Sequence, residues 1–241
     1  MSISFFILLF IVALLYASVG HGGASGYLAL MAIYGFAPDI MKPSALILNL
    51  FVSLTSFIMF YKGGHFKWKL FLPFALASIP FSFLGGTISL DAVIYKKVLG
   101  ILLLLPVVRF FLYPNTADAN LKSNNFILSL LIGAIIGFLS GLIGIGGGII
   151  LSPVLLLLNW SNQKQTAAIS ALFIFVNSIA GLVGQISKGI HIETSVYTFA
   201  AIAFVGGLLG AWLGSLKFNQ NILKFTLAIV LLMASVKLIL T

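Results

Sequence analysis

Long runs of apolar residues, separated by short polar connectors, fill the chain from one end to the other. A helix needs about 20 apolar residues to cross a bilayer core of about 30 Å. Two shorter apolar runs, at 27–36 and 149–160, each follow a glycine-rich interruption. Eight longer runs lie at 3–19, 45–61, 70–90, 93–113, 126–143, 167–186, 195–216 and 222–240. The pattern predicts an all-α fold, a polytopic bundle of transmembrane helices.

The two halves of the chain carry the same landmarks in the same order. Four features recur at an offset of 124 to 126 residues: Gly-x-Gly-Gly at 20 and 144, Ser-Ala-Leu at 44 and 170, Lys-Gly-x-His at 62 and 188, and a glycine at 85 and 210. Four matches in one order indicate an internal duplication. We expect a first membrane repeat at 1–113, a polar connector at 114–125 and a second membrane repeat at 126–241.

The first apolar run and the short run behind it are too long together for one crossing. Residues 3–36 would make a helix of about 51 Å, against a bilayer core of about 30 Å. If the chain turns back at the glycines, each half crosses three times and the halves are inverted, as in many secondary transporters. Without the turn, each half crosses four times and the halves are parallel. We expect inverted repeats, each with a Gly-broken helix or re-entrant hairpin.

Basic residues in the connectors give this arrangement an orientation. With hairpins, eight Lys and Arg residues fall on one side of the membrane and five on the other; with four crossings the division is seven and six. The side with eight is expected in the cytoplasm. The five on the opposite side are Lys42, Lys96, Lys97, Lys188 and Lys237, all placed in connectors or at their edges.

Composition supports a membrane protein and removes several other classes. Hydrophobic residues make up 61% of the chain and charged residues 7%, whereas a soluble domain has about 45–50% and about 25%. The net charge of +9 comes from few charges, so it fits connectors that meet anionic lipid headgroups rather than a nucleic-acid surface. The chain has no cysteine, which excludes disulfides and thiolate metal sites.

The two glycine-rich breaks, Gly20–Gly26 and Gly144–Ile150, are the candidate site. Unwound backbone at membrane depth is tolerated only where protein buries it or where it lines a wet cavity. The helix after each break begins with free N–H groups at the positive end of its dipole, which attracts anions. Close helix packing is the alternative role for these glycines. The candidate substrate-binding residues are Gly20, His21, Gly22, Gly23, Ser25, Asn49, Gly144, Gly146, Gly147, Gly148 and Asn177.

Three side chains near the breaks bear on this hypothesis. His21 is the one ionisable residue inside a break, and it could carry a coupled proton or simply bond backbone carbonyls that the break sets free. Asn49 and Asn177 are the most polar residues near the centres of their runs. Burying an amide is costly unless it is hydrogen-bonded, so both should face the bundle interior, to bind substrate or to tie down the broken backbone.

Other small residues are expected to have structural roles. Ser44 and its repeat equivalent Ser170 are expected near helix starts, where they could cap the helix or contact a ligand. Glycines recur at every fourth position in two ridges, which predicts close helix contacts. These ridges consist of Gly133, Gly137 and Gly141, and of Gly206, Gly210 and Gly214.

Acidic residues are absent from the predicted spans. Asp39, Asp91, Asp118 and Glu193 all fall in connectors, and an ionised Asp at the centre of a span would cost about 2.5–3.5 kcal/mol. This argues against a carboxylate relay, a metal site or a carboxylate-bound cation, and it fits a path for anions. Neither break has a nucleotide-binding fingerprint. We therefore expect no cofactor and no enzyme activity.

The paired breaks, the Ala-Ala-x-Ser-Ala-Leu-Phe segment at 167–173, the Lys-Gly-x-His connectors and the two-half organisation resemble the TauE/SafE, or TSUP, family of bacterial sulfite and organosulfur anion exporters. The resemblance covers nearly the whole chain. It implies a multi-pass permease of the bacterial inner membrane that moves sulfur oxyanions or sulfonates such as sulfite, thiosulfate or sulfoacetate. His21 stands where the second half has Ile145, so the first-half break would be the more polar one.

The functional expectation is transport of small anions by alternating access at a midplane site. The expected partners are a small anion, a coupling proton, the lipid bilayer and further copies of this chain, without nucleic acid. Two alternatives stay open from sequence: a carrier of a cation or neutral metabolite, and a membrane scaffold without transport. The acid-free spans speak against a cation, and the duplicated breaks speak against a scaffold.

Overall fold

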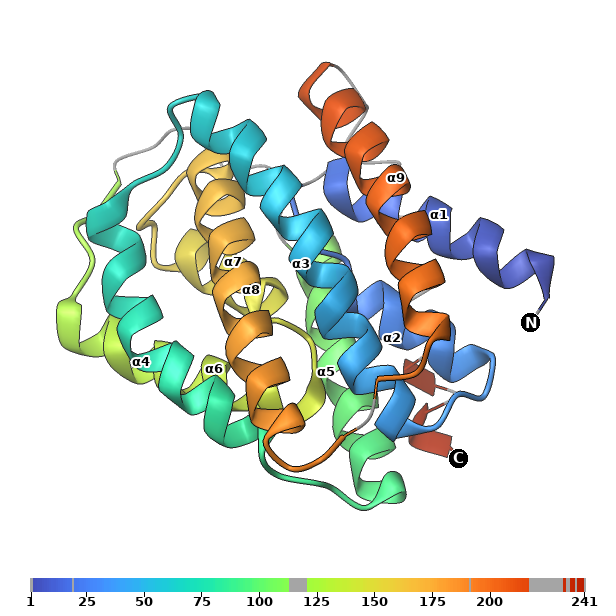
Figure 1. The fold of residues 1–241 in the computed structure, drawn as a ribbon. Coiled ribbons are helices and arrows are strands. Elements are labelled where there is room, and N and C mark those ends of the chain that lie inside the picture. The colour runs from blue at the N-terminus through green and yellow to red at the C-terminus, as the bar shows by residue number, and fades with distance from the viewer. Residues whose placement is uncertain are drawn as a thin grey trace.

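A computed structural model describes residues 2–18, 20–112, 121–190, 192–216, 232, 235–236 and 238–240. That part of the chain contains nine helices and no strand, so the all-α prediction is confirmed (Figure 1). The helices are α1 (Ile3–Ser18), α2 (Ala24–Ile33), α3 (Pro38–Lys62), α4 (Trp68–Gly86), α5 (Ala92–Leu112), α6 (Phe126–Ile143), α7 (Gly148–Leu157), α8 (Gln163–Ile186) and α9 (Ser195–Leu216). Most of the predicted crossing at 222–240, much of the connector at 114–125 and His191 lie outside the described residues.

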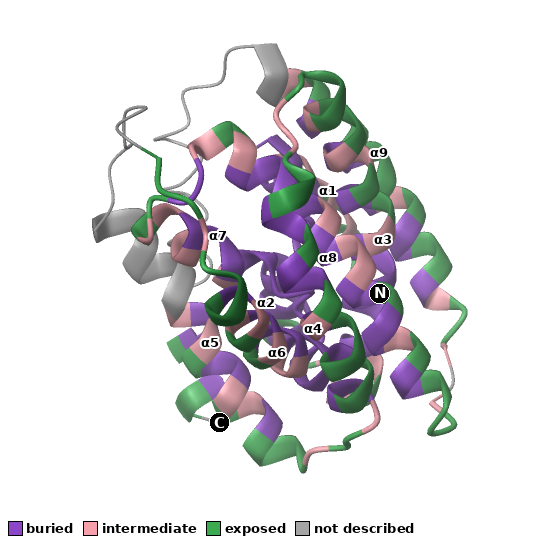
Figure 2. Cartoon of the chain, turned by 90° about the vertical axis from the view of Figure 1, so that its left-hand side faces the viewer, coloured by how far each residue is buried: buried purple, intermediate pink, exposed green. Residues whose placement is uncertain are grey.

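Among the residues that the structure describes, five helices are long and apolar enough to cross a membrane: α3, α4, α6, α8 and α9. Their outward faces carry large exposed apolar side chains, among them Leu76, Leu131 and Ile135. Figure 2 shows exposed residues along the outer faces of the helices and buried residues inside the bundle. An outer surface of this kind suits lipid contact.

The start of α3 differs most from the sequence prediction. The helix begins at Pro38, seven residues before the apolar run at 45, because Pro fits the first turn of a helix, where its missing N–H is not needed. Lys42, placed in a connector by sequence, is therefore inside α3 and buried. Ser44 and Ser170 are likewise inside α3 and α8 rather than at their starts, so the capping interpretation was wrong.

The described glycines of both ridges make close helix contacts, as predicted, while the surroundings of Gly214 lie outside the described part of the chain. A methyl group at Gly133 would lie 2.5 Å from the carbonyl oxygen of Phe74, and one at Gly137 would lie 2.5 Å from the Cα atom of Ser78. These two pairs keep the same residue offset, so α4 and α6 run parallel. Small residues at this spacing let backbones approach closely, which explains the extensive packing of α4 on α6.

The contacts between helices repeat with the duplication. A methyl group at Gly85 would meet the backbone of Phe138, and one at Gly210 would meet the backbone of Leu14. Gly85 and Gly210 are repeat equivalents, and so are Leu14 and Phe138. Hence α4 of the first half packs on α6 of the second half, whereas α9 of the second half packs on α1 of the first half. In each of these two contacts, a helix of one half packs against a helix of the other half.

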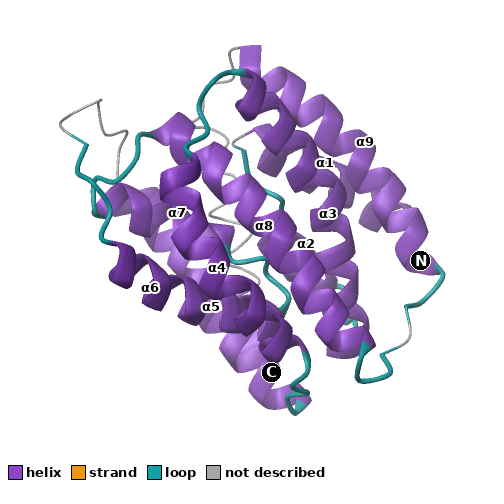
Figure 3. Ribbon diagram, turned by 60° about the vertical axis from the view of Figure 1, so that its left-hand side comes forward, coloured by secondary structure: helices purple, strands orange, loops and turns teal. Residues whose placement is uncertain are grey.

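The central pair, α3 and α8, consists of repeat-equivalent helices that run antiparallel. Asn49 of α3 contacts Ser178 of α8, and Leu46, earlier in α3, lies beside Gly181, later in α8. Figure 3 shows α3 and α8 within the bundle, with loops joining the helices. This pair brings the middles of the two halves together.

Each glycine break makes the chain fold back as a hairpin. The hydroxyl oxygens of Ser4, before the second turn of α1, and Tyr34, just after α2, are 2.8 Å apart. The ring centroids of Phe5 and Phe36 are 5.2 Å apart. In the second half, the backbone N–H of Lys122 donates to the carbonyl oxygen of Asn159 at 2.8 Å. The prediction of broken helices is confirmed, and both breaks have the geometry of a hairpin.

Candidate functional site

The two breaks have the same backbone design. Gly23 before α2 has φ 95°, and Gly147 before α7 has φ 77°. Glycine adopts this left-handed conformation without the steric cost that a side chain would add. Neither N-cap makes a side-chain cap hydrogen bond among the described residues. In α7 the N–H of Ile150 donates to the carbonyl oxygen of Gly147. The N–H groups before it, and those of the first turn of α2, are available to a ligand together with the positive end of each dipole.

Both breaks lie against the same two side chains, Asn49 of α3 and Ile174 of α8. A methyl group at Gly22 would lie 2.7 Å from Asn49 Oδ1 and 2.8 Å from Ile174 Cγ2. A methyl group at Gly146 would lie 2.5 Å from Asn49 Nδ2 and 2.9 Å from Ile174 Cγ2. We call the place where Gly22, Gly146, Asn49, Ile174 and Ser178 meet the junction. No side chain larger than hydrogen fits at either glycine without moving these neighbours.

The carboxamide of Asn49 is the polar centre of the junction. Its Nδ2 donates to Ser178 Oγ at 3.3 Å, and its Oδ1 is buried without a hydrogen-bond partner in the described part of the chain. An unpaired buried polar atom costs about 1–3 kcal/mol. The amide therefore has unused hydrogen-bonding capacity at the point where the breaks meet, which is what a binding group needs.

His21 connects the first break to the second half. Its Nε2 lies 2.9 Å from Ser152 Oγ in α7. Ser152 also lies 2.8 Å from Ser170 Oγ in α8 and donates to the carbonyl oxygen of Gly148 at 2.8 Å. Because a hydroxyl has one proton, Ser152 must accept hydrogen bonds from His21 Nε2–H and from Ser170. His21 thus makes a side-chain link between the two halves.

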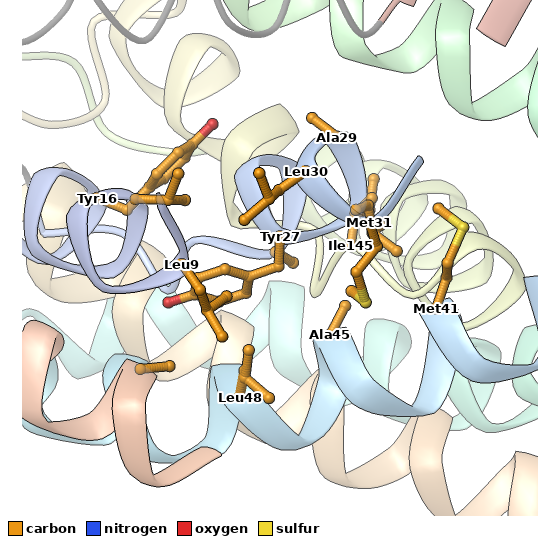
Figure 4. Close-up of a cluster of buried hydrophobic side chains, with 14 of the residues drawn as sticks. Leu9, Tyr16, Tyr27, Ala29, Leu30, Met31, Met41, Ala45, Leu48 and Ile145 are labelled. Atoms are coloured by element: carbon orange, nitrogen blue, oxygen red, sulfur yellow. The ribbon is translucent and has the colours of Figure 1, made fainter. Parts of the chain in front are cut away.

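The repeat position of His21 is apolar and packs differently. Ile145 of the second break belongs to a buried cluster with Met31 and Ala45, and Figure 4 shows its side chain beside Met31 of α2. The two breaks therefore share a backbone design but not a chemistry, with the polar side chain on the first break alone.

The remaining glycines and Ser25 hold the breaks in place. Gly148 also packs against Ile174, so it reaches the junction. Ser25 pairs with the hydroxyl of Tyr16 at 2.8 Å inside the first hairpin. The others face neighbouring elements: Gly20 faces Ala167 and Phe60, Gly23 faces Tyr27, Gly144 faces Lys42, and Gly147 faces Ile136 and Phe173.

Asn177 is not brought to the junction by its described contacts. Its Nδ2 donates to the carbonyl oxygen of Phe173 at 2.8 Å. The backbone carbonyl oxygen of Asn177 accepts from Ser82 Oγ, also at 2.8 Å. The adjacent Ser178 reaches the junction instead. Sequence reasoning missed Ser178 and Ile174, although Ser170, Ile174 and Ser178 follow the four-residue spacing that puts side chains on one helix face.

Comparison with known proteins gives this arrangement a family. The model of the sulfite exporter TauE/SafE family matches residues 5–238. The chain belongs to this family. It is therefore a membrane transporter of the TauE/SafE family, an integral membrane protein whose expected substrate is a small solute, and the resemblance seen in the sequence is confirmed.

Individual relatives agree with this family. A probable membrane transporter protein of Sinorhizobium fredii is 36% identical over 240 residues, 95% of either chain. A probable membrane transporter protein of Methanocaldococcus jannaschii is 31% identical over 215 residues, which is 84% of this chain and 78% of the relative. A "sulfite exporter TauE/SafE family protein 5" of Arabidopsis thaliana is 35% identical over 74 residues, 31% of this chain and 16% of that protein. No solved structure matches this chain.

Proposed function

We propose that this TauE/SafE transporter moves small anions, namely sulfur oxyanions or sulfonates such as sulfite, thiosulfate or sulfoacetate, and that the junction is their binding site. The observation that carries the proposal is the convergence of the two breaks on one buried amide, Asn49. The helices that follow the breaks start without a side-chain cap. Uncapped N–H groups bind oxyanions, and the amide can donate one more hydrogen bond.

Charge favours an anion over the alternative of a cation or neutral metabolite. Among the described residues, no Asp or Glu is buried, whereas one cationic side chain, Lys42, is buried in α3. The acids Asp39, Asp91 and Glu193 are exposed, and Asp118 lies outside the described residues. A cation would meet partial positive charge from two helix ends with no carboxylate to offset it. The family description, which names sulfite, points to the same chemical class.

Alternating access is supported by the relation between the halves. The repeat-equivalent helices α3 and α8 run antiparallel, which is the arrangement of inverted repeats if both cross the membrane. Inverted halves can exchange their two packing arrangements, so that a shared central site faces one side and then the other. We propose this mechanism in a bacterial inner membrane, with the eight-cation side in the cytoplasm. A coupling proton would bind at His21, the ionisable residue that faces Ser152.

Uptake into proteoliposomes tests the function directly. Purified transporter should give saturable uptake of radiolabelled sulfite, thiosulfate or sulfoacetate. Unlabelled anions should compete and unlabelled cations should not. The absence of saturable flux for all three anions would contradict the proposal, and competition by cations alone would favour the alternative solute class.

A pair of glycine variants connects this flux to the junction. Gly146 and Gly64 have φ of 71° and 73°, so replacing either by Ala adds the same backbone strain, about 1–2 kcal/mol. Only at Gly146 does the new methyl group meet Asn49 and Ile174, since nothing lies within 4 Å of it at Gly64. Gly146→Ala should lose most of its flux while Gly64→Ala keeps it. Wild-type flux in both variants would mean that Gly146 has no role in transport.

A further inference from the structure

A buried cation lies on α3, away from the junction. Lys42 is 5% exposed, and its ammonium group has three N–H donors. In the described part of the chain, Nζ donates to the carbonyl oxygen of Ile88 at 3.3 Å and lies 5.9 Å from the centroid of the Tyr95 ring. No carboxylate forms an ion pair with it there. Buried charges are normally paired, and the Lys42 ammonium group has N–H donors left for an anionic partner.

A buried amide on α8 also lacks hydrogen-bond partners. Gln185 is fully buried, and neither its Nε2 nor its Oε1 has a hydrogen-bond partner in the described residues. Leaving both ends of an amide unpaired costs more than leaving one, about 1–3 kcal/mol for each. A residue that only filled space here would be apolar. Both ends of the Gln185 amide are therefore free to hydrogen-bond a ligand.

Helical geometry places Lys42 and Gln185 at the same end of the α3–α8 pair. Lys42 is seven residues before Asn49 on α3, and Gln185 is seven residues after Ser178 on α8. Seven residues are nearly two helical turns, so each lies on the same face as the junction residue of its helix, about 10 Å along the axis. Asn49 and Ser178 face each other, and the two helices run antiparallel. Lys42 and Gln185 therefore occupy the facing sides at the same end.

The end of α4 gives a second reason for this placement. Gly86, the last residue of α4, packs on Gly181 and Gly184 of α8, directly before Gln185. Ile88, two residues further along, accepts the hydrogen bond from Lys42. The Lys42 ammonium group and the α8 backbone just before Gln185 thus both lie at the end of α4. The turn of the second break is next to them, because Gly144 packs on the backbone of Lys42.

We propose that Lys42 and Gln185 form a second, outer anion-binding subsite, which holds a small oxyanion about 10 Å from the junction, on the Pro38 side. The ammonium group supplies charge and the Gln185 amide donates a hydrogen bond, a pair that fits an oxyanion better than a cation or an apolar solute. This inference rests on the proposed anion transport and adds to it a second binding position between the junction and one face of the membrane.

A purely structural role makes a different prediction. Lys42 lies near the carboxyl end of α4, and it could simply stabilise the partial negative charge there. Its loss would then lower stability equally with and without anion and leave the half-saturating anion concentration unchanged. The two roles can therefore be separated by measuring affinity as well as stability.

The test uses Lys42→Met and Gln185→Leu in the intact transporter. In proteoliposomes, each should raise the half-saturating concentration of the transported anion about tenfold or more, as expected for losing one charge-assisted hydrogen bond. Lys188→Met is the matched control, because Lys188 is exposed and lies three residues from Gln185. It should behave like the wild type. Unchanged half-saturating concentrations in both test variants would overturn the subsite and leave the junction proposal standing.

Gln185→Glu keeps the test decisive if an apolar variant does not fold. The new carboxylate should pair with Lys42, preserve or raise thermal stability, and abolish anion affinity by occupying the cation. Transport by Gln185→Glu with wild-type affinity would contradict the proposal.

Binding separates this inference from the proposed function. Thiosulfate should raise the melting temperature of the detergent-purified wild type and of Lys188→Met, and not that of Lys42→Met or Gln185→Leu. If the wild type transports no anion but shows this pattern, the proposed function fails and the subsite is supported. If thiosulfate stabilises every variant equally, or none, the subsite is overturned.

Discussion

At the scale of single residues, Asn49 determines what the junction can hold. Its amide touches both breaks, has an unbonded buried oxygen and donates only a long hydrogen bond, 3.3 Å, to Ser178. Neutral polar groups at such a point can bind a charged solute without adding a fixed charge of their own. The sign of any charge placed at this position should therefore decide which solutes are accepted.

Asn49→Asp tests that sign with almost no change of shape. A carboxylate about 4 Å from a bound anion costs about 4 kcal/mol at an effective dielectric constant of 20, so anion uptake should fall by at least about tenfold. Asn49→Leu removes the hydrogen bonds without adding charge, so anion uptake should fall less in this variant. Initial uptake rates of the two variants give the comparison. Faster uptake by the Asp variant than by the Leu variant would identify the substrate as a cation.

At the scale of elements, the glycine breaks convert two apolar stretches into hairpins. The ends of each hairpin touch, at Ser4 and Tyr34 in the first half and at Lys122 and Asn159 in the second. A hairpin of this kind enters the protein from one face and returns to the same face. Its glycine turn reaches the interior, where the packing of α3 and α8 replaces the solvation that the unwound backbone has lost.

Cysteine labelling tests the first hairpin in a membrane. The chain has no native cysteine, and Ser2 and Asp39 are both exposed. Single variants Ser2→Cys and Asp39→Cys should react with a membrane-impermeant maleimide from the same side, because the hairpin returns the chain to the face from which it started. Labelling from opposite sides would mean that residues 3–36 cross the membrane.

The hairpins also mark the limit of prediction from sequence at this scale. The glycine clusters and their repetition are visible in the chain, and the predicted runs at 126–143 and 195–216 coincide with α6 and α9. The partners of the breaks are not visible, because Ser152, Ser178 and Ile174 reach them through the register between α3, α7 and α8. Lys42 was misplaced because polar residues at the start of α3 hide the beginning of that helix.

At the scale of the whole molecule, the repeat predicted from sequence agrees with the contacts between the halves. The glycine ridge of α6 packs on α4 and that of α9 packs on α1, and the equivalent residues Gly85 and Gly210 take part in these contacts. With α3 antiparallel to its counterpart α8, this pattern is consistent with two halves that enter the bilayer from opposite faces.

Opposite orientation of the halves gives a labelling result of its own. Asp39→Cys lies beside the first hairpin and Asn159→Cys beside the second, and both positions are exposed. In sealed vesicles, the impermeant maleimide should modify one of the two from outside and reach the other only after the membrane is opened. Equal modification of both in sealed vesicles of one orientation would show that the halves are parallel.

The exchanged ridges have a consequence for how the protein is assembled. The glycine surface that receives α1 is on α9, so α1 must wait until α2 to α8 have been synthesised before this partner exists. Until then the face of α1 formed by Phe10, Ala13 and Leu14 lacks its partner helix. Neither half can complete its own packing, and the nascent first half should depend on lipid, or on a membrane chaperone, to shield that face until the second half arrives.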